Sequence, residues 1–339
     1  MRFPLSLTRS LAGYLLKKRL SGQERFPLVL MLEPLHACNL SCKGCGRIRE
    51  YADTVRERLS IDQCLAAVDQ CGAPVVSVCG GEPLIYAGIE RLAAEIVDRR
   101  KHVYLCTNGL ELAGKIACFR PSGRLFFSIH LDGMESTHDA VVQRPGVFRQ
   151  AIAGIQAAKK AGFRVTTNTT IYRQTDMGEI VVLLEYLTEL GVDGMMITPA
   201  YGYEAVEKAG GNGSGELFMT RGEIQERFRR ARSALKRFRL VASPIYLDFL
   251  CGRRALPCAA WASPTRNVRG WKGPCYLTTD AHYASYQELL DSTDWSRLGP
   301  GRDPRCEHCL VHCGFEPAAV LSARWRLRDA LAMAVWQIT

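Results

Sequence analysis

The chain of 339 residues has no apolar run approaching the length that crosses a bilayer as a helix, about eighteen residues. Its first residues also lack a continuous apolar core followed by a small-residue cleavage site, so we expect no signal peptide. The 14 cysteines therefore suggest a reduced, cytoplasmic setting rather than a disulfide framework. Acidic residues are outnumbered by basic ones, 34 to 44, and the net charge of +10 favours an anionic partner, either lipid or nucleic acid.

Three cysteines stand close together in segment 35–48. They are Cys38, Cys42 and Cys45, with the spacing C-x3-C-x2-C. Three thiolates on one short loop can hold three irons of a 4Fe–4S cubane and leave the fourth iron open to a small molecule. Zinc sites also use closely spaced cysteines, so this spacing alone does not decide the metal.

The rest of the first 205 residues alternates between expected strands and helices. Six apolar segments should be strands, beginning near Leu28, Val75, His102, Leu125, Arg164 and Asp193. Helices fit between them over 61–71, 89–100, 147–161 and 177–190. This alternation predicts an α/β fold with a parallel sheet and crossover helices. Six units are fewer than the eight of a closed barrel, so we expect a partial (β/α)6 TIM-like barrel.

Polar motifs follow the expected strands at the end where parallel α/β folds bind ligands. The second strand leads into Gly80-Gly81-Glu82-Pro83. With the cysteine loop after the first strand, this arrangement resembles the radical S-adenosylmethionine (SAM) superfamily. The resemblance implies a catalytic 4Fe–4S cluster on the three loop cysteines, SAM chelated to its open iron, and the four-residue GGEP segment against the methionyl amine. It also implies an external electron donor of the flavodoxin or ferredoxin type.

Other polar side chains at the strand ends are candidate contacts to SAM or substrate. They are Asn108, Ser128, His130, Asn168 and Tyr201. For His130 the alternative is a hydrogen-bonded turn.

Five cysteines in the last quarter form a second group. Cys258 and Cys275 read C-x11-G-x4-C, and Cys306, Cys309 and Cys313 read C-x2-C-x3-C. These spacings are similar to the SPASM or twitch extensions of radical SAM enzymes. The similarity implies an auxiliary 4Fe–4S cluster on Cys258, Cys275, Cys306 and Cys309, with Cys313 as the alternative ligand. A structural zinc ion and unmetallated thiols are the competing interpretations.

Longer stretches resemble the hopanoid-biosynthesis radical SAM proteins, the adenosylhopane synthases. Among them are CLAAVDQCGAPVVSVCGGEPLIY, GVDGMMITPAYGYE and SPTRNVRGWKGPCYL. The resemblance implies that a 5′-deoxyadenosyl radical adds to the terminal alkene of the triterpene diploptene. Cys106, which closes the third strand, is our candidate catalytic residue, because a thiol S–H bond is weak enough to quench the resulting radical. Its alternative is a packing role. A different alkene or lipid, a peptide and an RNA are the alternative substrates.

We expect four parts along the chain: a helix in 1–25, the radical SAM barrel over 26–205, a cysteine-rich extension over 206–317 and a helix in 318–339. Both terminal helices are expected to be amphipathic. The apolar face of the first comprises Leu7, Leu11, Tyr14 and Leu15, and that of the last comprises Leu327, Leu331, Val335 and Ile338. Because a triterpene is insoluble, we expect peripheral membrane contact through these faces. Packing on the protein body is the alternative. Nucleic-acid binding is not expected.

Overall fold

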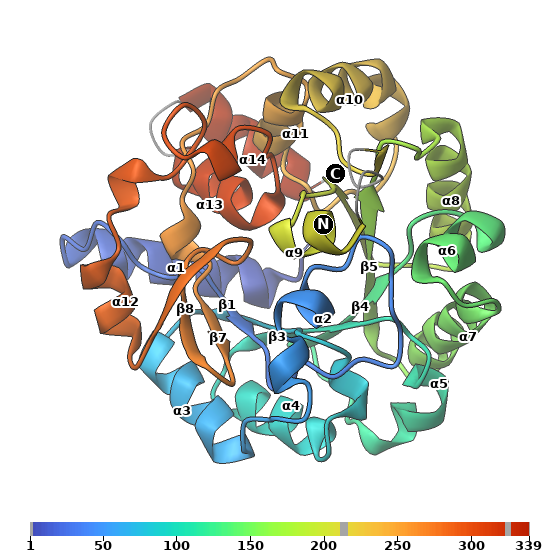
Figure 1. Ribbon diagram of the computed structural model, residues 1–339, viewed down its shortest axis with the longest axis horizontal. Coiled ribbons are helices and arrows are strands. Elements are labelled where there is room, and N and C mark those ends of the chain that lie inside the picture. Colours follow the sequence, from blue (N-terminus) through green and yellow to red (C-terminus); the bar gives the residue numbers. More distant parts are fainter. Residues whose placement is uncertain (1–2, 211–215, 323–326, 339) are drawn as a thin grey trace.

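A nine-stranded sheet organises the protein, in the order β6-β5-β4-β3-β2-β1-β7-β8-β9 (Figure 1). The computed structural model describes residues 3–210, 216–322 and 327–338. The strands are β1 (Val29–Leu32), β2 (Val75–Val78), β3 (His102–Thr107), β4 (Leu125–His130), β5 (Arg164–Ile171), β6 (Gly194–Pro199), β7 (Thr265–Asn267), β8 (Gly270–Pro274) and β9 (Thr279–Tyr283).

Helices occupy most of the segments between the strands. Within the barrel they are α2 (Arg47–Glu50), α3 (Ile61–Cys71), α4 (Ile89–Asp98), α5 (Leu112–Lys115), α6 (Glu135–Val142), α7 (Val147–Lys160) and α8 (Met177–Glu189). The remaining helices are α1 (Leu5–Leu20), α9 (Glu204–Gly210), α10 (Arg221–Leu235), α11 (Pro244–Leu250), α12 (Tyr286–Ser292), α13 (His312–Ser322) and α14 (Leu327–Ile338).

The six parallel strands β1 to β6 form the partial barrel that the sequence predicts. Each begins within one residue of its expected start, and neighbouring strands pair in parallel. The expected helices are also present as α3, α4, α7 and α8, which lie on the outside of the sheet (Figure 1). Local signals fix their ends: α3 begins at a capping box of Ser60 and Gln63 and ends at Gly72, whose φ of +67° suits glycine.

The cysteine-rich extension continues the barrel sheet. Strand β7 pairs in parallel with β1, and β8 and β9 follow as antiparallel neighbours. Main-chain hydrogen bonds cross this junction from Met31 N to Pro264 O, 2.9 Å, and from Glu33 N to Arg266 O, 2.9 Å. The first strand of the barrel is therefore covered on both edges, by β2 and by β7.

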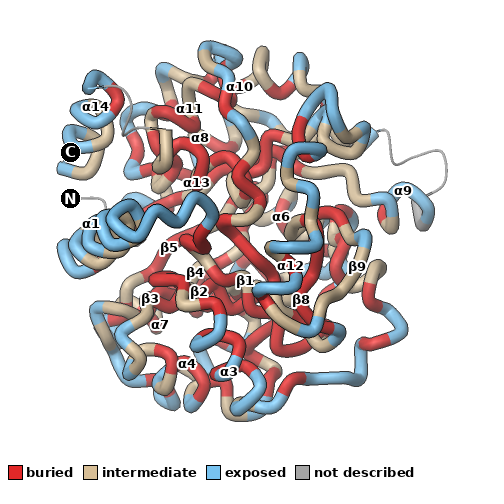
Figure 2. Tube along the Cα trace, turned by 90° about the vertical axis from the view of Figure 1, so that its left-hand side faces the viewer, coloured by how far each residue is buried: buried red, intermediate tan, exposed pale blue. Residues whose placement is uncertain are grey.

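The terminal helices α1 and α14 lie side by side (Figure 2). The face of α1 that we expected to meet a membrane packs instead on the body. Leu7 is buried, Leu15 packs against the core, and the Tyr14 hydroxyl donates to the Pro27 carbonyl at 2.8 Å. The prediction for that face of α1 was therefore wrong, because its apolar stripe is buried against protein.

The C-terminal segment contains two helices where we expected one. Residues 318–322 belong to α13, and the last helix, α14, begins at Leu327. Among the described residues, none of the helices combines the length and the apolar character needed to cross a bilayer.

A buried tyrosine fastens α11 to the loop that leads into α13. Tyr246 is fully buried, and its hydroxyl donates to the Leu310 carbonyl at 2.7 Å. We expect Tyr246→Phe to lower the free energy of unfolding by about 1–3 kcal/mol, because it leaves a buried carbonyl without its donor. Denaturant unfolding measures this. Tyr283→Phe, at a partly exposed ring, is the control, and equal losses in both variants would contradict the assignment.

Candidate active site

The loop that carries Cys38, Cys42 and Cys45 lies between β1 and α2, at the carboxyl end of the sheet. The thiols interact with one another: burial, with smaller contributions from Glu82 and Cys45, raises the pKa of Cys38 to about 11. Burial, followed by Cys45 and Cys38, raises the pKa of Cys42 far above its usual value. Because a neighbouring thiolate raises the pKa of Cys38 and of Cys42, the three sulfurs must lie close together. Bound iron would favour the thiolate forms, so this donor set fits a cluster.

The backbone of this cluster loop is held from several sides. The Arg49 guanidinium donates to the carbonyls of Cys42, at 3.0 Å, and Cys45, at 2.6 Å. The Lys43 amide donates to the Val141 carbonyl at 3.0 Å. Directly after β3, the Asn108 amide group donates to Asn39 Oδ1 at 2.7 Å and lies 4.0 Å from Cys38 Sγ. Asn108 therefore borders the cluster site.

The GGEP segment clamps the same loop from the side of β2. The amides of Gly81 and Glu82 donate to the carbonyls of Leu35 and Ala37 at 3.0 and 2.9 Å. A Cβ on Gly81 would stand 1.8 Å from the Ala37 oxygen, so only glycine fits there. Gly80 has a φ of +101°, and its Cβ would lie 2.5 Å from the Leu35 oxygen.

The carboxylate of Glu82 is engaged by the protein itself. It accepts from the Leu84 amide at 2.9 Å, from the Thr107 hydroxyl at 2.7 Å and from the Asn108 amide at 2.8 Å. Burial raises its pKa, and these donors oppose the rise. Glu82 thus joins the β2 and β3 loops, and Pro83 begins the short helical turn that follows. Contact between SAM and this segment stays a prediction.

Polar side chains from adjacent strands meet inside the barrel. Cys106 on β3 lies opposite Ser128 on β4, and its sulfur is 3.3 Å from the hydroxyl of Ser77 on β2. Burial raises the pKa of the Cys106 thiol, while the hydroxyls of Ser77 and Ser128 oppose the rise. At neutral pH this sulfur therefore carries its hydrogen.

Further along the same strands stand His130 on β4 and Asn168 on β5, which are paired in register. The His130 imidazole contacts the Asp132 carboxylate at 2.7 Å, and Asp132 also accepts from the Thr170 amide at 2.8 Å. Burial lowers the pKa of His130, but the carboxylate outweighs it and the net shift is upward. The Asn168 Oδ1 atom is buried with no hydrogen-bond partner among the described residues, as expected of an acceptor awaiting a ligand.

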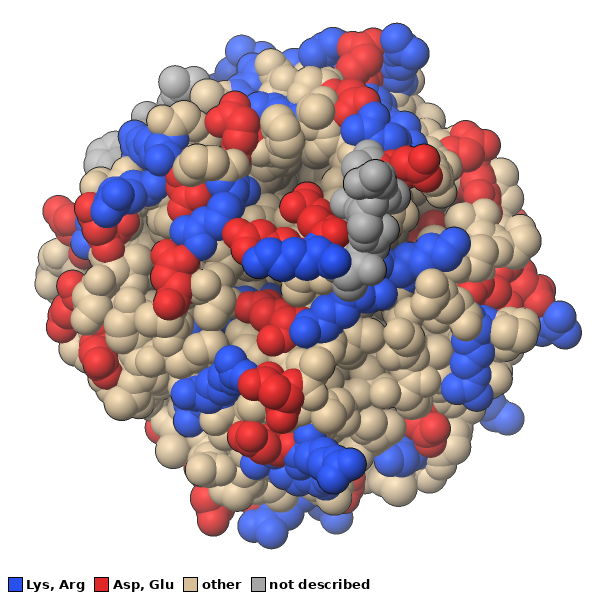
Figure 3. All heavy atoms as spheres, viewed as in Figure 1, with Lys and Arg blue, Asp and Glu red and all other residues tan. Residues whose placement is uncertain are grey.

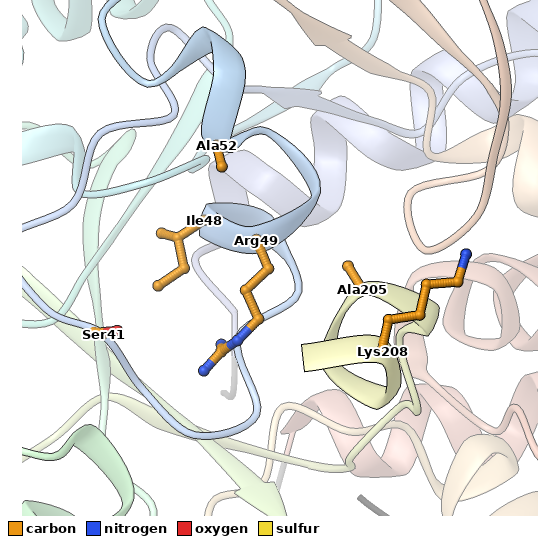
Figure 4. Close-up of a pocket in the computed structure, with 6 residues that line it drawn as sticks. All are labelled: Ser41, Ile48, Arg49, Ala52, Ala205 and Lys208. Carbon is orange, nitrogen blue, oxygen red and sulfur yellow. The ribbon is translucent and has the colours of Figure 1, made fainter. Parts of the chain in front are cut away.

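A pocket of about 670 Å³ opens beside the cluster loop (Figure 4). Ser41 of the loop, Arg49 of α2 and Lys208 of α9 are among the residues that line it. It is the candidate entrance to the site.

A buried charge network, most of which we did not predict, lies behind the cluster loop. Arg47 Nε is 3.2 Å from Glu33 Oε1, and both side chains are almost fully buried. Burial alone would raise the pKa of Glu33, but Arg47 and its other neighbours bring it down to about 2. Lys272 on β8 contacts Glu50 of α2 at 3.1 Å and donates to the Tyr276 carbonyl at 3.0 Å. The network ties the cluster loop to the extension.

The extension brings together all five of the cysteines that we assigned to an auxiliary site. Cys258, Cys275, Cys306, Cys309 and Cys313 line a single apolar cavity with residues such as Tyr276 and Phe315. The sulfur of Cys275 accepts from the amides of Leu277 and Thr278 at 3.3 and 3.4 Å. Such donors favour a thiolate ligand.

The five cysteines at this cavity are enough to supply the four thiolates of an auxiliary 4Fe–4S cluster. The identity of the metal stays a prediction. All five cysteines line the cavity, so the choice of four ligands, with Cys313 as the alternative, stays open.

Tyr201 lies with these cysteines. Its hydroxyl donates to the Arg305 carbonyl at 3.2 Å, and its pKa is raised first by burial and then by Cys275 and Cys309. Tyr201 thus lies beside the auxiliary cysteines, and its contact with SAM stays a prediction.

Two family models match the chain. Residues 32–187 match the radical SAM superfamily, and residues 195–333 match a domain of unknown function, DUF3463. Residues 32–187 form a radical SAM domain. This domain uses a 4Fe–4S cluster and SAM as cofactors, and the cysteine-rich C-terminal part of the chain is consistent with a further cluster.

The relatives with curated functions each resemble about half of the chain. An AdoMet-dependent heme synthase of Methanosarcina barkeri is 31% identical over 170 residues, which are 49% of this chain and 48% of the relative. A GTP 3′,8-cyclase of Campylobacter fetus is 28% identical over 160 residues, 45% of this chain and 50% of the relative. The chain thus spans about half the length of the curated relatives it matches.

Solved structures share the fold at low sequence identity. The enzyme anSMEcpe with bound AdoMet aligns with a TM-score of 0.57 at 14% identity, covering 91% of this chain and 96% of that chain. SuiB of Streptococcus suis bound to its precursor peptide SuiA aligns with a TM-score of 0.51 at 15% identity, covering 68% of this chain and 51% of that chain. These likenesses support the fold alone.

Replacing Gly81 should disturb the cluster loop. In Gly81→Ala the added methyl group would meet the Ala37 carbonyl, and we expect strain of about 1–3 kcal/mol together with a lower iron content after anaerobic reconstitution. Gly114→Ala, where the added Cβ meets nothing within 4 Å, is the control. Equal iron content in both variants would contradict the clamp.

Lys272 should make stability depend on pH. Burial lowers its pKa in the folded state from 10.5 to about 8. Between these values the unfolded chain binds more protons, so the contribution of Lys272 to stability rises with pH, by up to about 3 kcal/mol. We expect the unfolding free energy of the wild type, minus that of Lys272→Met, to become more positive from pH 8 to pH 10.5. A constant difference across that window would show that Lys272 titrates normally.

Proposed function

We propose that this enzyme adds a 5′-deoxyadenosyl radical to the terminal alkene of a triterpene of the hopene type and so forms a C–C bond. When bound, the cluster and SAM supply that radical, with Cys38, Cys42 and Cys45 as iron ligands. Support for the substrate comes from the stretches that resemble adenosylhopane synthases. Support for radical addition, rather than for hydrogen abstraction alone, comes from Cys106 in the barrel interior.

The position of Cys106 near the carboxyl end of β3, with its sulfur 3.3 Å from the Ser77 hydroxyl on the neighbouring strand, is the observation that carries the proposal. Radical addition to the unsubstituted alkene carbon leaves an unpaired electron on the tertiary carbon, and this carbon needs one hydrogen atom. Cys106 lies at the ligand-binding end of β3, and its raised pKa keeps the sulfur protonated. The S–H hydrogen passes to the carbon, leaving a sulfur radical. One electron from a flavodoxin- or ferredoxin-type donor and one proton restore the thiol.

The named relatives favour a second candidate, a heme-related or nucleotide substrate. Two basic residues, Arg49 and Lys208, line the pocket of Figure 4 and are compatible with an anionic substrate. Arg49 is already committed to loop carbonyls, and Lys208 lies 3.4 Å from Glu204, which makes this candidate the weaker one.

An RNA substrate has less support. Arg227 donates to the carbonyls of Tyr172, Arg173 and Thr175, and Arg232 pairs with Asp248. On the face shown in Figure 3, basic and acidic side chains are interspersed rather than segregated. Two arginines of helix α10 thus bind groups within the protein and are not available to bind phosphates.

The reaction is tested with reconstituted enzyme under anaerobic conditions. We expect SAM, reductant and diploptene to give an adenosylated product detectable by mass spectrometry, whereas GTP or a heme precursor in place of diploptene gives no adduct. Free 5′-deoxyadenosine without an adduct from diploptene would overturn the proposal and favour hydrogen abstraction from another substrate.

The role of Cys106 has its own test in D2O. Exchange converts S–H to S–D, so the wild type should place one deuterium on the quenched carbon. Cys106→Ala should lower the yield of the saturated adduct roughly tenfold or more, since each 1.4 kcal/mol added to the barrier costs a factor of ten. Cys118→Ala, at an exposed cysteine, should match the wild type. Unchanged yield and deuterium content in Cys106→Ala would reject the role.

A further inference from the structure

The two terminal helices expose apolar side chains on their outer faces. On α1, Leu5, Leu16 and Leu20 are 50%, 56% and 81% exposed, and their spacing of 11 and 4 residues places them on one stripe. On α14, Leu327, Leu331 and Ile338 are 90%, 65% and 70% exposed and also share one stripe. We call these six residues the terminal-helix face. Of the nine large apolar residues that are exposed among the described residues, only Val55 and Val182 lie outside these two helices.

The two helices are joined to each other and to the body. The Gln337 amide group donates to the Phe3 carbonyl at 2.8 Å and to the Thr8 hydroxyl at 2.9 Å, and the rings of Phe3 and Trp336 meet edge to face at 5.5 Å. The Asp329 carboxylate pairs with Arg254 on the body. The terminal-helix face is therefore a defined surface of the folded protein (Figure 2).

The charged residues of α1 are all basic. Segment 5–20 contains four basic residues and no acidic residue; the basic ones are Arg9, Lys17, Lys18 and Arg19. The only acidic residue of α14, Asp329, is buried against Arg254. An apolar stripe with cations beside it matches the interface of an anionic bilayer. A second copy of this chain would bring like charges together, because the same basic helix would face itself.

We infer that α1 and α14 together form a docking surface for an anionic lipid bilayer, with both helices lying in the headgroup plane. This inference concerns the outer stripe of α1, since the inner stripe packs on the protein. In Figure 2, α9 lies at the opposite end of the molecule from α1 and α14. Docking thus turns the pocket of Figure 4 away from the bilayer. The inference does not depend on which substrate the enzyme uses.

The test is co-sedimentation of the reconstituted full chain with vesicles. We expect binding to vesicles of phosphatidylcholine with phosphatidylglycerol, and weak binding to phosphatidylcholine alone. Leu327→Gln/Leu331→Gln should weaken partitioning at least tenfold, because each exposed leucine loses the burial it would gain in lipid. Val55→Gln/Val182→Gln, at the exposed apolar residues elsewhere, is the matched control and should bind like the wild type.

A second pair of variants tests the charge contribution. Lys17→Gln/Arg19→Gln should weaken binding roughly twenty-five-fold, at about fivefold for each base near an anionic surface, whereas Lys160→Gln/Lys236→Gln should not. All four variants change surface residues, and their iron content and thermal unfolding should equal those of the wild type.

Three results would overturn the inference: no binding to the anionic vesicles, equal binding by the leucine variant, or a wild-type dimer in sedimentation velocity that the leucine variant dissociates. The last result would assign the face to a second copy of the chain. None of these measurements involves turnover, so their failure is distinct from failure of the proposed reaction.

Discussion

The cluster loop has no secondary structure of its own, and its shape depends on how closely the GGEP segment approaches it. At Gly81 the two backbones lie so close that a methyl group would overlap the Ala37 carbonyl. Two amides of this segment donate into the loop, and the Glu82 carboxylate binds the next loop along. The position of the thiols and the position of the β3 residues that face them are thus fixed by one set of contacts.

This arrangement accounts for how the two halves of the site come together. Cys38 is bordered by Asn108 from the end of β3, and Cys106 stands two residues earlier on the same strand. A thiol that remains protonated inside the barrel would be a poor metal ligand, whereas the cysteines of the loop must ionise to bind iron. Cys106 and the loop cysteines are the same residue type, so their different chemical roles depend on their surroundings in the structure.

Much of the barrel could be predicted from sequence because apolar runs end at glycine and polar residues, and strand starts were placed within one residue. The same reasoning could not find β7, which is three residues long and entirely polar, because pairing with β1 and β8 rather than an apolar pattern defines that strand. Lys272 was missed for a similar reason: lysine is rarely buried, and its partner Glu50 is more than two hundred residues away. On α1, the pattern identified a packed stripe correctly but could not say what covers it.

The junction between β1 and β7 also bears on how this protein could be divided. The two family matches end and begin between residues 187 and 195, which suggests a natural place to cut the chain. A fragment that stops there would leave the hydrogen-bonding groups of β1 open along one edge, and such an edge invites pairing with other chains. This fragment would also lack Lys272, which contacts the Glu50 carboxylate of α2 in the whole protein. The catalytic half, by itself, would be prone to aggregate.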